Sequence, residues 1–242
     1  MRIPRLFHPQ PLAGLERVLL SDEAFGHAVR VLRLREGDPL RLFDGSGGEY
    51  TAELERVERR EAWVRIGAFD AVERESPLRV WLGQGLSRGE RMEIAIQKAV
   101  ELGVSRITPL QVARSVVRLD EQKARKRQAR WNEVAVAACE QSGRNRLPTI
   151  DPPQPLGSWL TPHDGPRLLL DPADGIRLAD LSPPESGQVS VLVGPEGGLD
   201  ETERALARQH GWQPVRLGPR VLRTETAPLA ILAALQVLWG DL

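Results

Sequence analysis

Two segments in the C-terminal half carry residues whose types suit ligand binding. The first, Gly194–Gly198, reads Gly-Pro-Glu-Gly-Gly and directly follows the apolar run 189–193. Glycines without a Cβ let backbone N–H and C=O groups approach a ligand closely, and the carboxyl end of a buried strand is where open α/β sheets bind ligands. The segment predicts backbone hydrogen bonding to a flat or polar ligand, with the Glu196 carboxylate nearby. An ordinary strand-to-helix turn is the alternative.

Known nucleotide-binding patterns do not fit this loop. The Lys-Ser/Thr pair of a phosphate-binding loop is absent after the second glycine, and the spacing is not G-x-G-x-x-G. A nucleoside triphosphate or a dinucleotide is therefore disfavoured as the ligand.

The second segment, 217–227, combines a turn with charged residues at the start of an expected helix. Thr224 or Thr226 can cap that helix, while Arg223 and Glu225 offer charged groups for chemistry. An ion pair with a structural role is the usual alternative for such an arginine and glutamate. Taken together, the two segments are much more specific than either one alone.

The elements that position these segments follow an α/β pattern. Residues 78–83 are predicted to form a strand, 91–102 an amphipathic helix and 104–110 a second strand, which together make a parallel βαβ unit. The remaining expected elements are a helix over 123–142, buried strands over 168–171 and 189–193, a helix opening at 200–203, a short strand over 214–217 and an apolar helix over 228–239.

The first 70 or so residues have a different character, with short alternating runs joined by turns. Strands are expected over 39–43, 49–56 and 62–69, and a helix from the N-cap candidate Ser21 toward Val31. This pattern predicts a small β-barrel. A charged stretch at 71–77 separates the barrel from the rest of the chain, so we expect one domain over residues 1–72 and a second over 73–242.

Composition narrows the function class less than the motifs do. The chain has 33 basic and 33 acidic residues, so the net charge gives no sign of nucleic-acid binding, and the distribution of charge matters more. Nearly all the positive charge is arginine, which suits phosphate recognition but equally suits a thermophilic source or a GC-rich genome. The only cysteine, Cys139, excludes an intramolecular disulfide and a cysteine-rich metal centre. We expect it to be buried.

Targeting signals and membrane spans are not expected. The first residues lack the apolar run of a signal peptide, and no window approaches the roughly 20 apolar residues of a membrane span. A cytoplasmic protein with no membrane partner and no metal site is the default expectation.

The two ligand-binding segments resemble those of the SPOUT class of knotted methyltransferases, specifically the ribosomal RNA small-subunit methyltransferase E family. Further stretches match that family at 88–93 (RGERME), 96–104 (IQKAVELGV), 114–117 (RSVV) and 140–144 (EQSGR), and the stretch 27–33 with Gly37-Asp38 and Asp44-Gly45 resembles its N-terminal barrel. The resemblance covers nearly the whole chain. Arg88 and Glu90 depart from the lysine and aspartate common in the family, and both changes keep the charge.

The resemblance implies a fold, an activity and partners. The expected fold is an α/β domain with a parallel sheet and a deep trefoil knot, preceded by a PUA-like RNA-binding β-barrel. The implied reaction is methylation of N3 of a uridine in small-subunit (16S) ribosomal RNA, with S-adenosylmethionine as cofactor and a homodimer as the working form. A knotted methyltransferase for transfer RNA or large-subunit RNA, and a non-catalytic ribosome-assembly factor, are the alternatives.

Residue roles are implied by position. The cofactor pocket is expected to comprise Leu170, Gly194, Glu196, Gly197, Gly198, Leu217, Gly218, Val221, Leu222 and Thr226. Candidate RNA contacts are Arg30, Arg33, Arg114, Arg118, Arg144 and the run 123–130, for which a solvated helix face is an equal alternative.

Methylation of N3 requires a group that promotes the loss of the N3 proton. Uracil N3 is a poor nucleophile until its proton leaves, so a proton acceptor or a cation that stabilises the anion is required. Arg223 is the candidate for charge stabilisation, and Glu225 or Glu196 for accepting the proton or orienting the base. Either acid can instead hold an arginine in place.

Overall fold

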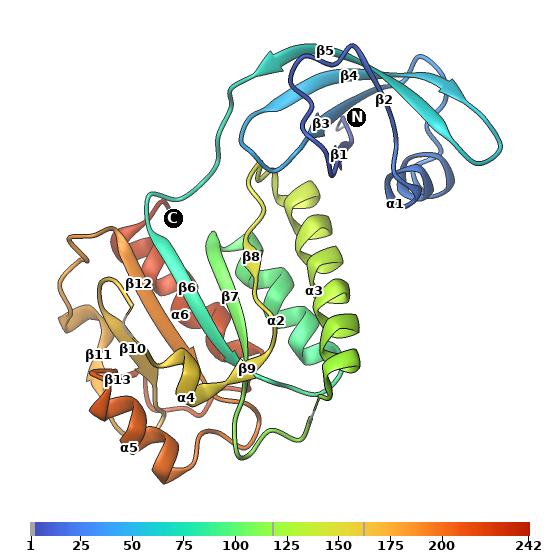
Figure 1. The fold of residues 1–242 in the computed structure, drawn as a ribbon. Coiled ribbons are helices and arrows are strands. Elements are labelled where there is room, and N and C mark those ends of the chain that lie inside the picture. The colour runs from blue at the N-terminus through green and yellow to red at the C-terminus, as the bar shows by residue number, and fades with distance from the viewer. Residues whose placement is uncertain (1–2, 118, 162) are drawn as a thin grey trace. The chain divides into compact units, whose positions relative to one another are not determined.

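The computed structural model describes residues 3–117, 119–161 and 163–242, so the predicted phosphate contact Arg118 lies outside the described residues. The chain divides into two compact units (Figure 1). The first comprises residues 1–75 and 136–147, and the second comprises residues 76–135 and 148–242. The domain assignment from the sequence has a single boundary and so does not contain the return of the chain at 136–147.

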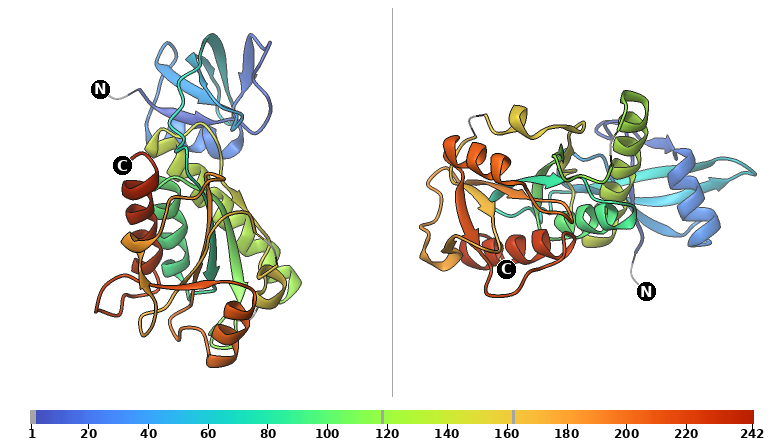
Figure 2. Two further views of the ribbon diagram at one scale, coloured as in Figure 1. Left: turned by 90° about the vertical axis from the view of Figure 1, so that its left-hand side faces the viewer. Right: turned by 90° about the horizontal axis from the view of Figure 1, so that it is seen from below.

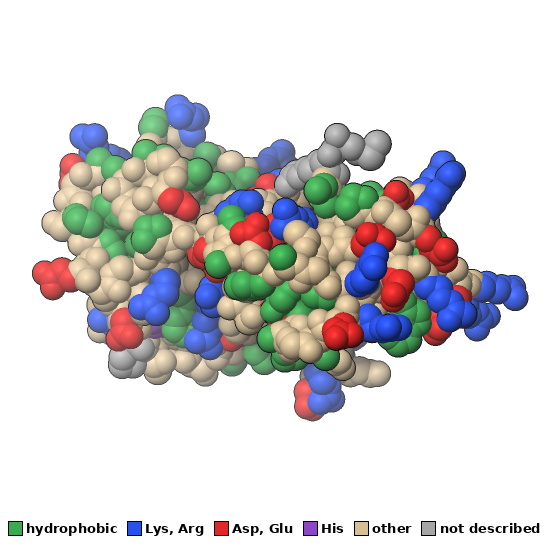
Figure 3. Space-filling view, turned by 90° about the horizontal axis from the view of Figure 1, so that it is seen from above, with side chains coloured by type: hydrophobic (Ala, Val, Ile, Leu, Met, Phe, Trp, Pro, Cys, Tyr) green, Lys and Arg blue, Asp and Glu red, His purple; other side chains and the backbone are tan. Residues whose placement is uncertain are grey.

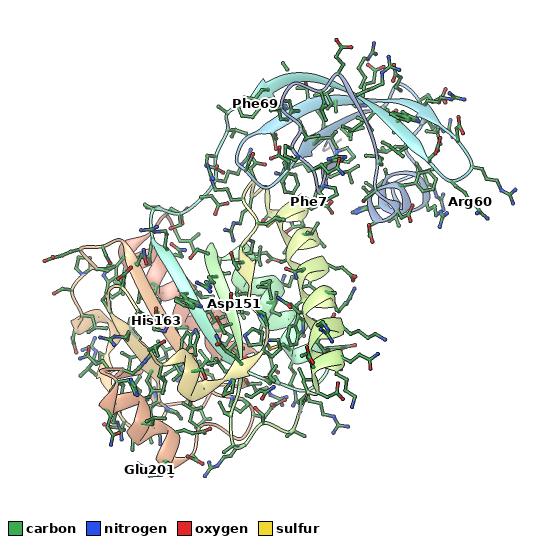
Figure 4. The ribbon with its side chains drawn as sticks, viewed as in Figure 1. Phe7, Arg60, Phe69, Asp151, His163 and Glu201 are labelled. Atoms are coloured by element: carbon green, nitrogen blue, oxygen red, sulfur yellow. The ribbon has the colours of Figure 1, made fainter. Side chains whose placement is uncertain are left out.

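The first unit is a curled five-stranded sheet in the order β1-β3-β4-β5-β2. The strands are β1 (Arg5–Phe7), β2 (Arg17–Leu19), β3 (Pro39–Phe43), β4 (Glu49–Val57) and β5 (Ala62–Asp70). β1 and β3 are parallel and the other pairs are antiparallel. The three strands expected from alternation are confirmed, because every second side chain faces a core that includes Leu40, Leu54 and Val64. Figure 4 shows Arg60 projecting outward at the turn between β4 and β5.

The helix of the first unit begins as predicted. Ser21 is the N-cap of α1 (Asp22–Phe25), and its Oγ accepts a hydrogen bond from the Ala24 N–H at 3.2 Å. The chain then continues as a π-helical turn, Gly26–Val31. Phe25 and Ala28 are buried against the sheet, so this segment closes one side of the core.

Arg5 ties the returning segment 136–147 into the first unit. Its guanidinium donates hydrogen bonds to the carbonyls of Cys139, Glu140 and Arg144, at 2.7, 3.1 and 3.0 Å, and to the Asn145 side chain. The same group pairs with Glu49 at 2.8 Å. A single buried arginine therefore joins β1 to the carbonyls of residues 139–144, at and just beyond the end of a helix.

Cys139 is fully buried, as expected, and burial raises the pKa of its thiol to about 12. The Cys139 side chain is therefore part of the packing of this segment.

The second unit contains a parallel sheet in the order β11-β13-β10-β12-β6-β7-β8. Its strands are β6 (Arg79–Gly85), β7 (Val104–Gln111), β8 (Thr149–Ile150), β9 (Gln154–Pro155), β10 (Arg167–Leu170), β11 (Ile176–Arg177), β12 (Gln188–Val193) and β13 (Gln213–Arg216). β9 pairs with β7 off the main path. Each of these pairs is parallel. The predicted βαβ unit is confirmed by β6, α2 and β7.

Helices cover both faces of this sheet (Figure 2). They are α2 (Glu90–Glu101), α3 (Glu121–Ser142), α4 (Leu156–Trp159), α5 (Glu201–Gln209) and α6 (Thr226–Trp239), with a 3₁₀ turn at Leu178–Asp180. α2 and α6 pack against each other on one face. On α2, Met92, Ile96 and Val100 recur every four residues and are buried, which is the periodicity of an amphipathic helix.

The opposite face carries an aromatic cluster beneath α4 and α5. The His163 ring lies 4.2 Å from Trp81, 4.7 Å from Trp159 and 5.4 Å from Trp212, centroid to centroid. His163 Nε2 donates to the Trp159 carbonyl at 2.6 Å, and Nδ1 forms a hydrogen bond with Ser190 Oγ at 3.1 Å. Burial lowers the pKa of His163 below its ordinary value. Figure 4 labels this residue beside the sheet.

Among the described residues, no helix has both the length and the apolar content needed to cross a bilayer. The apolar helix α6 instead buries Ile231, Leu232 and Leu235 in the second unit, and each such side chain stabilises the fold by roughly 1.5–3 kcal/mol. This burial places the apolar side chains of α6 in the core of the second unit.

Candidate functional site

A pocket of about 310 Å³ lies where the carboxyl ends of neighbouring strands of the parallel sheet meet. Its walls come from the segments that follow β10, β12 and β13. The lining residues are Arg114, Leu169, Leu170, Asp171, Pro172, Val193, Gly194, Pro195, Glu196, Gly197, Gly198, Leu199, Arg204, Leu217, Gly218, Arg220, Val221, Leu222 and Ala227. Its volume is at the low end of the range for small-molecule sites.

The loop after β12 needs its glycines for close packing. A Cβ on Gly194 would lie 3.1 Å from the backbone of Gly198, and a Cβ on Gly197 would lie 3.0 Å from the Cβ of Arg114. Gly198 has a φ of +66°, a conformation that side chains disfavour. The loop therefore presents backbone groups to the pocket, as the sequence predicts.

The Glu196 carboxylate is engaged by the connection between β6 and α2. Oε1 accepts hydrogen bonds from the Arg88 N–H and from Arg91 Nη1, both at 3.0 Å. Burial alone would raise the pKa of Glu196, but these hydrogen bonds and the Arg91 charge lower it below the ordinary value. Glu196 lines the pocket, yet its carboxylate holds Arg91, which was the structural alternative for this residue.

Thr224 joins the two predicted segments through a buried hydroxyl. Its Oγ1 donates to the Gly194 carbonyl at 3.0 Å and accepts from Ser87 Oγ at 3.1 Å and from Gln84 Nε2 at 3.3 Å. Thr224 therefore does not cap α6, and the capping prediction is wrong for it.

The other capping candidate fails for a different reason. Thr226 is the first residue of α6, whose N-cap is Glu225 with no side-chain hydrogen bond to the helix. Thr226 is also missing from the pocket lining, where Ala227 stands instead.

The two candidate catalytic side chains flank Thr224. Arg223 is exposed, and Glu225 is partly buried with Oε2 4.0 Å from Arg91 Nε. Glu225 Oε2 is itself buried and has no hydrogen-bond partner in the described part of the chain. A buried acceptor without a hydrogen bond is costly, and neither Glu225 nor Arg223 is among the residues that line the pocket.

Asp171 and Arg204 line the pocket although the sequence did not single them out. The Asp171 carboxylate is almost fully buried; it accepts from the Ala173 N–H at 2.9 Å and lies 4.0 Å from Arg204 Nε and 3.7 Å from Arg208 Nη2. The sequence pattern that could have identified Asp171 was present, because Asp171 directly follows a buried strand just as Gly194 does. Arg204 was hidden on a helix face and gave no such signal.

The predicted RNA contacts in the first unit separate into exposed and buried arginines. Arg30 and Arg33 are exposed, and the Arg30 guanidinium lies 5.3 Å from the Phe25 ring centroid. Arg144 is only 4% exposed, and its Nε donates to Glu75 Oε1 at 3.0 Å. A buried, paired guanidinium does not reach a phosphate, so the prediction for Arg144 is corrected to a structural role.

In the second unit, Arg114 is exposed at the pocket and donates to the Gly197 carbonyl at 3.1 Å. On α3, Lys123 pairs with Asp120 at 2.9 Å, Arg125 with Glu121 at 3.0 Å and Arg130 with Glu93 at 3.0 Å. These pairs favour the solvated-face interpretation of the run 123–130. Figure 3 shows Lys and Arg side chains interspersed with Asp and Glu on the face of the molecule that it draws.

Comparisons with known proteins bear on both units. Residues 74–236 match the model of an RNA methyltransferase domain, and residues 20–67 match that of an RNA methyltransferase PUA domain. A Bacillus subtilis protein named ribosomal RNA small subunit methyltransferase E is 33% identical over 92% of each chain, and one from Buchnera aphidicola (Schizaphis graminum) is 32% identical over 100% of this chain and 98% of its own. This chain belongs to the ribosomal RNA small subunit methyltransferase E family.

Solved structures support the same family. A Legionella pneumophila protein solved with bound SAM has a TM-score of 0.96, 40% identity and coverage of 100% of both chains. A ribosomal RNA small subunit methyltransferase E from Neisseria gonorrhoeae, bound to S-adenosyl methionine, has a TM-score of 0.92, 41% identity and coverage of 99% of both. The predicted family, its methyltransferase class and the α/β fold with a preceding PUA domain are confirmed. The trefoil knot itself stays a prediction.

Proposed function

We propose that this protein transfers the methyl group of S-adenosylmethionine to N3 of a uridine in 16S ribosomal RNA of the small subunit. The observation that carries the proposal is the pocket in which the loops 194–198 and 217–222 meet at the carboxyl edge of the sheet. Relatives of this family, named for small-subunit ribosomal RNA, are similar over essentially the whole chain, including both loops.

The pocket residues fit the proposed cofactor. Leu170, Leu217 and Leu222 provide apolar walls for an adenine ring, and the glycine loop provides backbone hydrogen-bonding groups. Within the predicted set, Gly194, Glu196, Gly197, Gly198, Gly218 and Val221 also line the pocket. S-adenosylmethionine, when bound, supplies an electrophilic methyl group, and the protein's own residues must prepare the acceptor.

Glu225 and Arg223 are proposed to prepare the uracil. The Glu225 carboxylate, whose Oε2 lies 4.0 Å from Arg91 Nε, accepts the N3–H hydrogen bond and then the proton. The exposed Arg223 guanidinium stabilises the negative charge that develops on the base. Thr224, between them, fixes both residues relative to Gly194.

The RNA is proposed to contact exposed arginines of both units. In the PUA-like unit, Arg30 and Arg33 would bind phosphates of the RNA, and Arg114 would bind a phosphate beside the pocket.

The proposal also includes a homodimer and a cytoplasmic location. Val237 and Leu238 at the end of α6 are 66% and 45% exposed and provide apolar surface for a second copy. Light scattering on the purified protein tests the dimer.

The reaction is tested on small subunits from a strain that lacks the modification. The expected result is N3-methyluridine, detected by mass spectrometry after nuclease digestion, that appears only with S-adenosylmethionine present. Calorimetry that detects no cofactor binding would leave a non-catalytic assembly factor, and methylation of transfer RNA or large-subunit RNA instead would identify a different substrate.

The residue roles need a separate test. Arg223→Ala and Glu225→Gln should each lower kcat by about 10²–10³-fold with cofactor affinity unchanged. Arg79→Ala and Glu185→Gln, which remove the same charges from exposed positions away from the pocket lining, are the controls. Wild-type turnover in Arg223→Ala or Glu225→Gln would remove that residue from the chemistry.

A further inference from the structure

Two arginines stand side by side at the edge of the parallel sheet next to the pocket. Arg177 of β11 and Arg216 of β13 are register partners on neighbouring parallel strands. Both are exposed. Like charges on directly paired strand positions repel each other and destabilise a sheet.

Carboxylates do not neutralise this pair. Asp174, close to Arg177 in sequence, lies 3.2 Å from Arg208 Nη2, and Asp171 lies 3.7 Å from the same atom. Within the described residues, neither the Arg177 nor the Arg216 guanidinium forms an ion pair. Most other arginines of the second unit are held by an acid or by a carbonyl, as Arg106, Arg130 and Arg167 are.

The arginine pair lines a hollow that shares a wall with the cofactor pocket. The hollow is formed by Arg177, Leu178, Ala179, Arg216, Gly218 and Pro219. Gly218 also lines the pocket, as does the exposed Arg220 two residues further on. The loop after β13 therefore has the cofactor pocket on one side and the arginine pair on the other.

We propose that Arg177 and Arg216 together bind a backbone phosphate of the RNA strand that carries the target uridine. Two guanidinium groups on adjacent strands present several N–H donors to one phosphate, which is the geometry that arginine favours. The shared loop would then set the position of that strand relative to the cofactor pocket. The inference rests on the proposed function, because it assigns the phosphate to the RNA substrate.

The test is the salt dependence of substrate recognition. Arg177→Gln, Arg216→Gln and the double variant are compared with wild type in methyl transfer to small subunits lacking the modification, over a series of salt concentrations. Arg79→Gln is the matched control, because Arg79 is an exposed arginine at the amino end of β6, whereas the pocket lies at the carboxyl ends of the strands. Cofactor affinity is measured by calorimetry for each variant.

The expected result is specific to a shared phosphate. Each single variant should raise KM for the subunits by about 3- to 10-fold and lower the slope of log KM against log salt concentration by about 1. The double variant should raise KM by less than the product of the two single fold-changes, because the contact with the same phosphate is lost in each case. The kcat at saturating subunits, the cofactor affinity and all values for Arg79→Gln should stay at the wild-type level.

Three results would overturn the inference. KM and salt slope equal to those of Arg79→Gln would show that no phosphate binds there. Weakened self-association in light scattering, with KM unchanged, would assign the pair to a contact between copies. Loss of cofactor affinity alone would assign it to the cofactor pocket.

A wild-type protein that does not methylate the subunits would instead contradict the proposed function. Sedimentation binding to the same subunits would still test the arginine pair.

Discussion

Replacement of Thr224 by valine should weaken cofactor binding by removing the hydroxyl that joins the two pocket loops. Valine keeps the shape of the side chain but deletes one donor and one acceptor. Thr224 is 6% exposed, so water does not replace the lost bond. Gln84 Nε2 keeps the Gly85 carbonyl as an acceptor, and the Ser87 hydroxyl can turn its proton to the same carbonyl, which leaves the Gly194 carbonyl as the group that loses its donor.

The expected loss of stability and affinity follows from that one missing hydrogen bond. A buried acceptor left without its donor costs about 1–3 kcal/mol, which corresponds to a decrease in Tm of roughly 3–10 °C at this chain length. Because Gly194 lines the pocket, part of the cost should appear as roughly tenfold weaker S-adenosylmethionine binding, equivalent to about 1.4 kcal/mol.

The assay pairs calorimetry with thermal unfolding for Thr224→Val and Thr224→Ser. The serine variant keeps the hydroxyl, so its affinity should stay close to that of wild type. If Thr224→Val bound the cofactor and melted as wild type does, or if the serine variant were as weak as the valine variant, the hydroxyl would not be what holds the loops together.

Three further predictions concern groups outside the pocket. Because burial lowers the pKa of His163, the unfolded chain takes up the proton more readily; the Tm of wild type should fall relative to His163→Gln as the pH drops below about 6.5, and level off below the lowered pKa. Arg5→Met should lower the free energy of unfolding in urea by about 3 kcal/mol, since the buried Glu49 carboxylate keeps only the more distant Arg41, at 3.7 Å. Cys139 should resist iodoacetamide at about pH 8 until the chain is unfolded, as followed by mass spectrometry.

Local patterns in the sequence were enough to place most elements. Alternation located β3, β4 and β5, and continuous apolar runs located β10 and β12, because side-chain periodicity reflects which faces are buried. The acidic opening at Asp200 predicted α5, where Asp200 and Glu203 form a capping box. Among the loops that line the pocket, 194–198 was found because it comes directly after a buried strand.

Contacts between distant residues were beyond the same reasoning. Arg144 looked like a surface arginine until its pairing with Glu75, 69 positions away, was visible. Thr224 looked like a helix cap, yet it bonds a carbonyl 30 positions earlier in the chain. Both errors have one cause: a polar side chain takes the best partner in three dimensions, and local sequence does not name that partner.

The return of residues 136–147 to the first unit has a consequence for how the protein is made. On the ribosome the N-terminal residues emerge first, but the Arg5 guanidinium does not meet its carbonyl acceptors until residue 145 has been synthesised. During that interval the Arg5 guanidinium lacks its hydrogen-bond acceptors from residues 139–145, while the chain of the second unit begins to emerge. Such distant pairing slows folding, so the first unit matures late, and a fragment ending at residue 75 would lack the last piece of its own fold.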